Sequence, residues 1–377
     1  MSNDQLLSKT ISYLRFPLTV GVVFIHFSLH NGLEVHGQVH GMGNPDWFFF
    51  IVNLVSQVLA WVCVPLFFII SGYLFFYNTD FDNRVYARKL KSRSRSLLVP
   101  YVVWNFIAIL WMMKCLIPLV ASFFRPVEID LSFQRIISTF FCNTDNHGIF
   151  VGPDPTVPDT ATYPIDGPLW YIRDLMVLVV LSPVIHWLIK RLKMMLPVTL
   201  FLGWFLSPVI FPNGGYLEML VTAGFFFSWG AYMSINRRNM VVDFSRFKFL
   251  PFIYLAVALL DAYVRLDAPN PYLHRVGVIL GIISTVVVAS SLLEKDRVKV
   301  NLTLGGSSFI IFASHSIYIG DLGKLLFTVL HVPEDNPYCM LALYFAVPLL
   351  CVLFGIALYV LLRKCCPVLL RLLNGGR

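Results

Sequence analysis

Long apolar runs separated by short polar segments are the dominant pattern along the chain. Most runs approach or exceed the about 20 residues that a helix needs to cross a bilayer. Alternating ten-residue strands, which are typical of a membrane β-barrel, are absent. We therefore predict an all-α polytopic membrane protein with about ten transmembrane helices. The predicted spans cover approximately residues 10–30, 47–77, 97–124, 168–189, 196–212, 217–236, 249–265, 274–293, 304–330 and 339–364.

The second of these runs is too long for one straight crossing. Pro65 lies inside it, and a proline in a helix interior removes a hydrogen bond and kinks the helix. We expect a kink near this residue.

Lys and Arg are concentrated in the polar segments that alternate spans place on one side of the membrane. Because positive residues accumulate in cytosolic loops, this pattern predicts that both termini are cytosolic. An even number of spans agrees with that topology. The segment at about 125–167 then becomes an extracytoplasmic loop, and its latter part, "GPDPTVPDTATYPIDGP", is expected to be irregular. The basic segments are "NRVYARKLKSRSR", "KRLK", "RRNMVVDFSRFK", "EKDRVK" and "RKCCPVLLRLLNGGR".

The composition excludes an ordinary soluble domain, because only 13% of the 377 residues are charged and 57% are hydrophobic. The net charge of +8 suits loops facing anionic lipid, so no nucleic acid partner is expected. The N-terminal segment lacks a basic n-region and a cleavage site, which predicts a retained first helix. The seven cysteines show no paired metal spacing, and no metal is expected. Cys142 and Cys339 could both lie outside the membrane and form a disulfide.

Arg15 and His26 are the first candidates for function, because ionisable groups at membrane depth are costly. Their spacing of eleven residues is about three helical turns, so they share one face with a rise of roughly 16 Å. Arg15 could snorkel to the inner interface while His26 makes a structural hydrogen bond. Alternatively, Arg15 holds an anionic substrate near the cytosolic side and His26 takes a proton or an acyl group. Both side chains would then line one cavity.

Two later segments carry further candidates. In "GPLWYIRDL", Arg173 and Asp174 are adjacent, so their side chains should diverge by about 100° and find partners other than each other. That arrangement favours a polar cavity. His315, in "LGGSSFIIFASH", lies deep in the ninth span and could line a cavity or make a structural hydrogen bond. Ser71 and Gly72 are small residues that predict close helix packing.

The segment "RKLKSRSRSLLVPYVVWN" is typical of a positive anchor before a helix. Arg88, Arg93 and Arg95 in this segment could instead bind the phosphates of a cytosolic nucleotide-like donor. The chain contains no Gly-rich phosphate loop, HExxH, zinc set or GxSxG elbow. Histidine-centred acid–base or acyl-transfer chemistry is therefore what the residues permit.

Five segments, in this order, resemble the acyltransferase-3 family of membrane proteins. Arg15, ten residues and His26 resemble its R-x10-H signature, and "PLFFIISGYL" resembles its FFxxSGY segment. "KLKSRSRSLLVPYVVW" resembles its basic stretch before a Pro-Tyr helix start, and "GPLWYIRDL" its LWFL-R-D-L block. "LGGSSFIIFASH" resembles its LGxxSYxIYLxH block, although Phe309 and Phe312 replace the usual tyrosines. Residues 1–377 would form one transmembrane acyltransferase domain of the stand-alone form.

The resemblance implies transfer of an acyl group, usually acetyl, from cytosolic acyl-CoA to a hydroxyl of a cell-surface or lipid-linked glycan. It implies that His26 is catalytic and that Arg15 takes part in donor binding or site organisation. Arg173 or another cation would stabilise the oxyanion, and His315 or Asp174 could orient His26. The expected partners are acyl-CoA, the glycan and membrane lipid, and the expected location is a bacterial inner membrane.

Two other classes of protein explain part of the pattern. A transporter or flippase of a glycan or another anionic solute would also need buried charges and a long outer loop. No internal repeat is visible, although many transporters contain one. A non-catalytic scaffold would place Arg15, His26 and Arg173 in separate, dry packing contacts.

Overall fold

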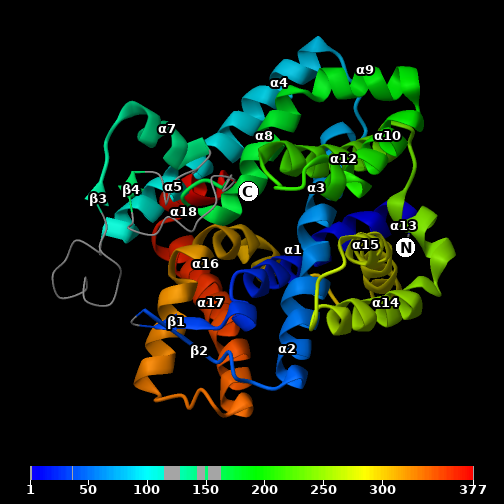
Figure 1. The fold of residues 1–377 in the computed structure, drawn as a ribbon. Helices are drawn as coiled ribbons and strands as arrows, with labels where there is room; N and C mark the ends of the chain where they lie inside the picture. Colours follow the sequence, from blue (N-terminus) through cyan, green and yellow to red (C-terminus); the bar gives the residue numbers. More distant parts are fainter. Residues whose placement is uncertain (1, 36, 114–127, 142–148, 152–162, 377) are drawn as a thin grey trace.

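Helices make up most of the computed structural model, which describes residues 2–35, 37–113, 128–141, 149–151 and 163–376 (Figure 1). Two short antiparallel strand pairs, β1 (Leu33–Val35) with β2 (Gln38–His40) and β3 (Glu128–Ile129) with β4 (Phe150–Val151), accompany them. The helices of the first half are α1 (Asn3–Ile25), α2 (Asp46–Val52), α3 (Cys63–Phe76), α4 (Asn83–Arg93), α5 (Val99–Met112) and α7 (Phe133–Phe141). Those of the second half are α8 (Trp170–Val180), α9 (Ser182–Leu192), α10 (Met195–Phe205), α11 (Ser207–Ile210), α12 (Tyr216–Ile235), α13 (Met240–Phe244), α14 (Leu250–Val264), α15 (Pro271–Glu294), α16 (Leu302–Val329), α17 (Pro337–Cys365) and α18 (Pro367–Asn374).

The helical membrane architecture is confirmed. Within the described residues, six helical segments are long and apolar enough to cross a membrane, and two pairs bent by 64° and 75° raise the number to eight if each pair is one span. Each of the ten predicted runs overlaps one of these segments or lies on α10 or α12. The full count of ten and the cytosolic position of both termini stay predictions.

Parts of three predictions fall outside the described residues. The structure does not describe residues 114–124, which form the end of the predicted third span. It also does not describe the Pro-rich stretch 152–162 of the predicted outer loop. Cys142 also lies outside, so its pairing with Cys339 stays a prediction. The described part of the outer loop contains α7 and the β3–β4 pair.

The second predicted span is interrupted just before Pro65. A π-helical segment, Asn53–Leu59, and a 3₁₀ turn, Ala60–Val62, separate α2 from α3. Proline cannot donate a hydrogen bond to the carbonyl four residues earlier, so the helix changes its geometry there. The π-helical segment also brings the Ser56 hydroxyl to the Phe24 carbonyl, at 2.6 Å, which ties it to the end of α1.

Close packing of α3 on α12 confirms the prediction made for Ser71 and Gly72. A Cβ atom added to Gly72 would lie 2.0 Å from the Phe227 carbonyl oxygen. In return, a Cβ on Gly230 would lie 2.0 Å from the Ile69 carbonyl oxygen. The two backbones therefore touch where each helix lacks a side chain, as small residues permit in membrane helices.

Helix α1 lies in the middle of the molecule, next to α3, α15, α16 and α17 (Figure 1). It starts with a capping box, in which the Ser2 hydroxyl accepts from the Gln5 amide and the Gln5 side chain accepts from the Ser2 amide. Asn301 caps α16 by accepting from the amides of Thr303 and Leu304. These caps fix the two helices that carry the candidate histidines.

Candidate active site

His26 and His315 come together in the structure. His26 caps the C-terminal end of α1, and His315 lies in the middle of α16. Their ring centroids are 5.0 Å apart, with the ring planes at 59°. His315 is completely buried, whereas His26 is exposed. The sequence left open whether His315 lines a cavity or only makes a structural hydrogen bond. The structure pairs it with His26.

The hydrogen bond of His315 defines its tautomer. Its Nδ1 atom lies 3.0 Å from the Ile311 carbonyl oxygen. Because a carbonyl oxygen only accepts, Nδ1 must carry a proton, and the neutral ring then has its lone pair on Nε2. That buried Nε2 atom has no hydrogen bond to any described residue. A proton acceptor is therefore held next to the exposed His26 ring.

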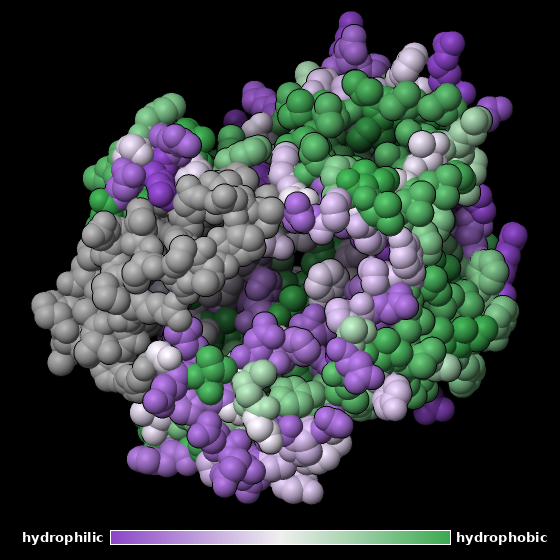
Figure 2. Space-filling view, viewed as in Figure 1, coloured by the Kyte–Doolittle hydropathy of each residue, from purple (hydrophilic) through white to green (hydrophobic). Residues whose placement is uncertain are grey.

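The surface opens above this region. Figure 2 shows a hollow near the middle of the face in view, over the place where Figure 1 draws α1 and α16, with polar residues around its opening. Exposure of His26 at the end of α1 agrees with such an opening. A substrate hydroxyl could reach an imidazole that is exposed in this way.

Arg15 lies on α1, as predicted, and is exposed. Thr19 and Val22 lie between it and His26 on the same helical face, and each of these two residues is only 1% exposed. Arg15 and His26 are thus accessible at two ends of a packed face. The shared face is confirmed, while packed side chains occupy the stretch between the two groups.

The prediction that Arg173 and Asp174 would not pair is wrong. The Arg173 Nε atom donates to Asp174 Oδ1 at 2.8 Å, and both side chains are buried. Although adjacent residues on a helix diverge at Cβ, the long arginine stem can bend back to its neighbour. Both groups are removed from water, and a buried ionised group is strongly stabilised by a partner.

Arg173 has further contacts that anchor α8. Its Nη1 atom donates to the Phe141 carbonyl at 2.6 Å, and its guanidinium lies 4.6 Å from the Tyr216 ring centroid. These contacts join α8 to the end of α7 and to α12. Of the two residues suggested to orient His26, the structure places His315 beside it and joins Asp174 to Arg173.

Asp166 is a buried carboxylate that the sequence interpretation missed. It is 1% exposed, and its Oδ1 atom accepts a hydrogen bond from the Ser316 hydroxyl at 2.5 Å. The backbone N–H of Asp166 donates to Asn105 Oδ1 at 3.2 Å, and this hydrogen bond links Asp166 to α5. Ser316 directly follows His315 on α16. The only signal in the sequence was the position of Asp166 at the entrance of the fourth predicted span, within a segment that resembled an exposed loop.

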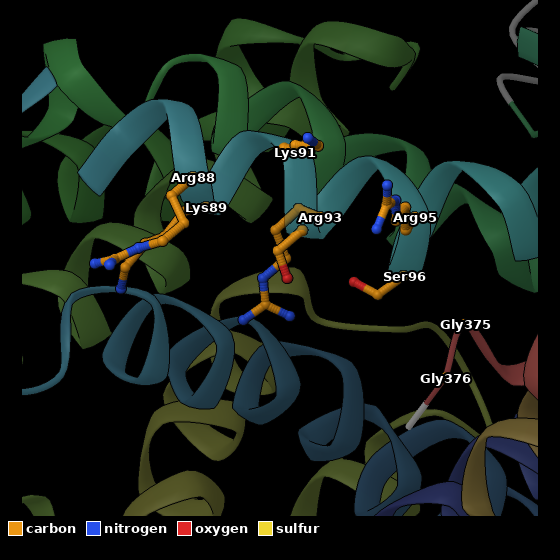
Figure 3. Close-up of a pocket in the computed structure, with 9 residues that line it drawn as sticks. Arg88, Lys89, Lys91, Arg93, Arg95, Ser96, Gly375 and Gly376 are labelled. Atoms are coloured by element: carbon orange, nitrogen blue, oxygen red, sulfur yellow. The ribbon is translucent and has the colours of Figure 1, made fainter. Parts of the chain in front are cut away.

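The three arginines predicted to bind phosphates line one cavity of about 620 Å³ (Figure 3). They come from α4 and from the π-helical segment Ser94–Leu98 that follows it. Lysines join them, and no acidic residue is among the described residues that line the cavity. Uncompensated cations in one cavity favour an anionic ligand. The lining residues are Arg88, Lys89, Lys91, Ser92, Arg93, Arg95, Ser96, Gly375 and Gly376.

Aromatic rings lie between this cavity and the histidine pair. Arg93 lies in the cavity wall on α4, and α4 packs against α8, which carries Tyr171. The ring centroids of Tyr171 and Phe312 are 5.9 Å apart, and those of Phe312 and His315 are 6.5 Å apart. Phe312 is one of the two positions at which phenylalanine replaces the tyrosine of the resembled family. The cavity and the imidazoles are therefore connected through a short row of side chains.

The described residues contain no group of three or more His, Cys, Asp or Glu side chains that could hold a metal ion. The site that the structure does present consists of two imidazoles and a nearby cation-lined cavity in a helical membrane protein.

Comparison with known proteins assigns the class. Residues 9–362 match the acyltransferase-3 family, described as an acyltransferase domain, so the chain belongs to this family and is a membrane acyltransferase. It is similar to the succinoglycan biosynthesis protein ExoH of Rhizobium meliloti (strain 1021), with 28% identity over 394 residues, covering 99% of this chain and 94% of that protein. No solved structure matches the chain. Membership in an enzyme family favours the acyltransferase over the transporter and the scaffold.

Proposed function

We propose that this protein transfers an acetyl group from cytosolic acetyl-CoA to a hydroxyl of a cell-surface or lipid-linked glycan, in a bacterial inner membrane. The observation that carries the proposal is the His26–His315 pair, in which one imidazole is exposed and the other presents a lone pair at a fixed position. The similarity to a protein of succinoglycan biosynthesis supports a glycan as the acceptor.

The cation-lined cavity is the proposed site for the phosphates of the donor. Arg88, Arg93 and Arg95 can hold phosphate oxygens through charge-assisted hydrogen bonds. From Arg93, the thioester arm would run past Tyr171 and Phe312 to the imidazoles. Arg15 would assist from the middle of α1, where it is exposed on the same helical face as His26.

His26 is the proposed base. It takes the proton of the acceptor hydroxyl while the hydroxyl oxygen attacks the thioester carbonyl carbon. When the tetrahedral intermediate collapses, the carbon–sulfur bond breaks and the CoA sulfur receives the proton from His26. A hydrogen bond from the His26 ring to Nε2 of His315 would hold His26 in its reactive orientation. The oxyanion role of Arg173 stays a prediction, since its described contacts are to Asp174, Phe141 and Tyr216.

An acyl-histidine relay needs the same two rings. In that route the His26 nitrogen attacks the thioester first, CoA leaves, and the acceptor oxygen then displaces the acyl group from nitrogen. The routes are separated by incubating the protein with radiolabelled acetyl-CoA in the absence of acceptor, denaturing it rapidly at neutral pH and removing free donor at once. Only the relay leaves label on the protein, and that label should be lost on acidification because acid hydrolyses an acyl-imidazole.

The proposal is tested with purified protein in lipid nanodiscs, supplied with radiolabelled acetyl-CoA and lipid-linked glycans from a bacterium that makes an acylated polysaccharide. We expect label in an alkali-labile ester of the glycan, located by mass spectrometry. Absence of CoA binding together with absence of transfer would reject the donor assignment.

Replacement of Arg93 by Gln tests the phosphate site. Loss of one charged hydrogen bond to a phosphate should raise the KM for acetyl-CoA roughly ten- to a hundredfold, with kcat little changed. Arg246→Gln is the matched control, since Arg246 is an exposed arginine in another basic segment. An equal response of the two variants would mean that general surface charge, and not this cavity, attracts the donor.

A further inference from the structure

The helix α18 is attached to the wall of the cation-lined cavity. After α17 ends at Cys365, the chain turns and α18 packs against α5. Leu370 and Leu373 are buried, and Trp104 Nε1 of α5 donates to the Leu373 carbonyl at 2.8 Å. The position of α18 is therefore set by both apolar packing and a buried hydrogen bond.

The C-terminal end of α18 is also held in place, by a glycine cap and several hydrogen bonds. Gly375 caps the helix with φ 69° and ψ 24°, a left-handed conformation that favours glycine. The amides of Gly375 and Gly376 both donate to the Arg371 carbonyl, and Gly376 also donates to the side chain of the buried Asn374. These hydrogen bonds hold the two glycines in one conformation.

Gly375 lies directly on the backbone of Ser96. A Cβ atom added at Gly375 would lie 2.5 Å from the Ser96 carbonyl oxygen and 2.7 Å from its Cα atom. Contacts this short exclude any side chain without a shift of the backbone. Because Ser96 follows Arg95 in the segment that carries the cations, Gly375 also fixes that part of the cavity wall.

The cavity thus has two chemically different ends. Figure 3 shows Arg88 and Lys89 together at one end and Ser96 near Gly375 and Gly376 at the other, with Arg93 between. Cations suit phosphates. At the other end, Gly375 is covered by Ser96, but no atom lies within 4 Å of a Cβ added to Gly376, so the bare backbone of Gly376 lets a flat ring approach closely. Arg95 lies beside Ser96, within the same end of the cavity.

We propose that Gly375, Gly376 and Ser96 form the binding site for the nucleoside end of the donor, with Arg95 serving its 3′-phosphate. This assignment rests on the proposed function, in which acetyl-CoA is the donor. The pyrophosphate then lies at Arg93, from which the thioester arm runs towards Tyr171. Gly375 is a specificity-determining residue in this arrangement, since it shapes the nucleoside end and lies away from the reacting atoms.

The test compares two donors in the nanodisc assay, acetyl-CoA and S-acetyl-4′-phosphopantetheine, which has the same thioester but no nucleoside. For Gly375→Ala we expect the KM for acetyl-CoA to rise about tenfold, with the KM for the truncated donor within about twofold of wild type. Gly37→Ala is the matched control. Gly37 has a similar φ of 78°, and no atom lies within 4 Å of its added Cβ.

A second variant serves if Gly375→Ala fails to fold. Trp104→Phe keeps an aromatic ring at this buried position, removes the indole N–H that donates to the Leu373 carbonyl and leaves a small gap beside α18. We expect it to raise the KM for acetyl-CoA about threefold and to leave the truncated donor unaffected. Equal changes for both donors, or no change for either, would overturn the nucleoside assignment alone. If the wild type used neither donor, the proposed function itself would fail, and the assignment with it.

Discussion

The His26–His315 pair and the Arg173–Asp174 pair both consist of ionisable side chains in predicted membrane spans. The two pairs differ in their burial and in their hydrogen-bond partners. Arg173 and Asp174 are buried and bonded to each other, and Arg173 also contacts a carbonyl and aromatic rings. His26 is exposed, and the Nε2 atom of His315 has no hydrogen bond to the described residues. One pair is bound into the packing, whereas the other combines an exposed ring with a buried ring that keeps an unpaired nitrogen among the described residues.

The difference follows from the charge of the groups. A buried guanidinium and a buried carboxylate each lose several kcal/mol of hydration, so they persist only with partners at hydrogen-bonding distance. A neutral imidazole loses much less and can keep a free lone pair at the edge of a cavity. Burial with partners therefore indicates a structural role for Arg173 and Asp174, whereas an exposed imidazole beside a buried ring with an open lone pair fits the role proposed for His26.

The sharpest test of this comparison is His26→Ala. Loss of a general base should lower kcat about 10²- to 10⁴-fold while the unfolding midpoint in detergent changes little, because His26 is exposed. Ester formation on the glycan measures the rate. His331→Asn is the control, since His331 is exposed and its φ of 48° is one that asparagine tolerates. Full activity in the His26 variant would end its assignment as the base.

Arg173→Met tests the other pair. Removal of one partner leaves the Asp174 carboxylate buried without its cation, which should lower the free energy of unfolding by about 3–5 kcal/mol. The double variant Arg173→Met/Asp174→Leu should recover most of this loss, because both charges are gone. Thermal or denaturant unfolding in detergent measures stability, and transfer is assayed in parallel. A double variant that folds normally but transfers no acyl group would give Arg173 the oxyanion role predicted from the sequence.

His315→Phe probes the second ring of the histidine pair. Phenylalanine keeps an aromatic ring against His26 but removes Nε2 and the hydrogen bond to Ile311. Loss of one neutral hydrogen bond that orients the base should lower kcat about tenfold, with the KM for acetyl-CoA unchanged. A loss as large as that of His26→Ala would instead place His315 directly in proton or acyl transfer.

Several features were predictable from the sequence because they depend on local order. Apolar length predicted the helices, and a spacing of eleven residues put Arg15 and His26 on one face of a single helix. Arg88, Arg93 and Arg95 occur within eight consecutive residues, so continuous helical structure brought them to one cavity.

Only the tertiary structure brought the distant partners together. His315 meets His26 across 289 residues of chain, and Asp166 meets Ser316 across 150. Gly375 meets Ser96 through the return of α18 onto α5. These contacts depend on which helices pack together, at what angle and with which rotamers, and none of these properties is encoded in the periodicity of one segment. Hydrophobicity and helical spacing act along the chain, whereas reactive geometry is set by packing between helices.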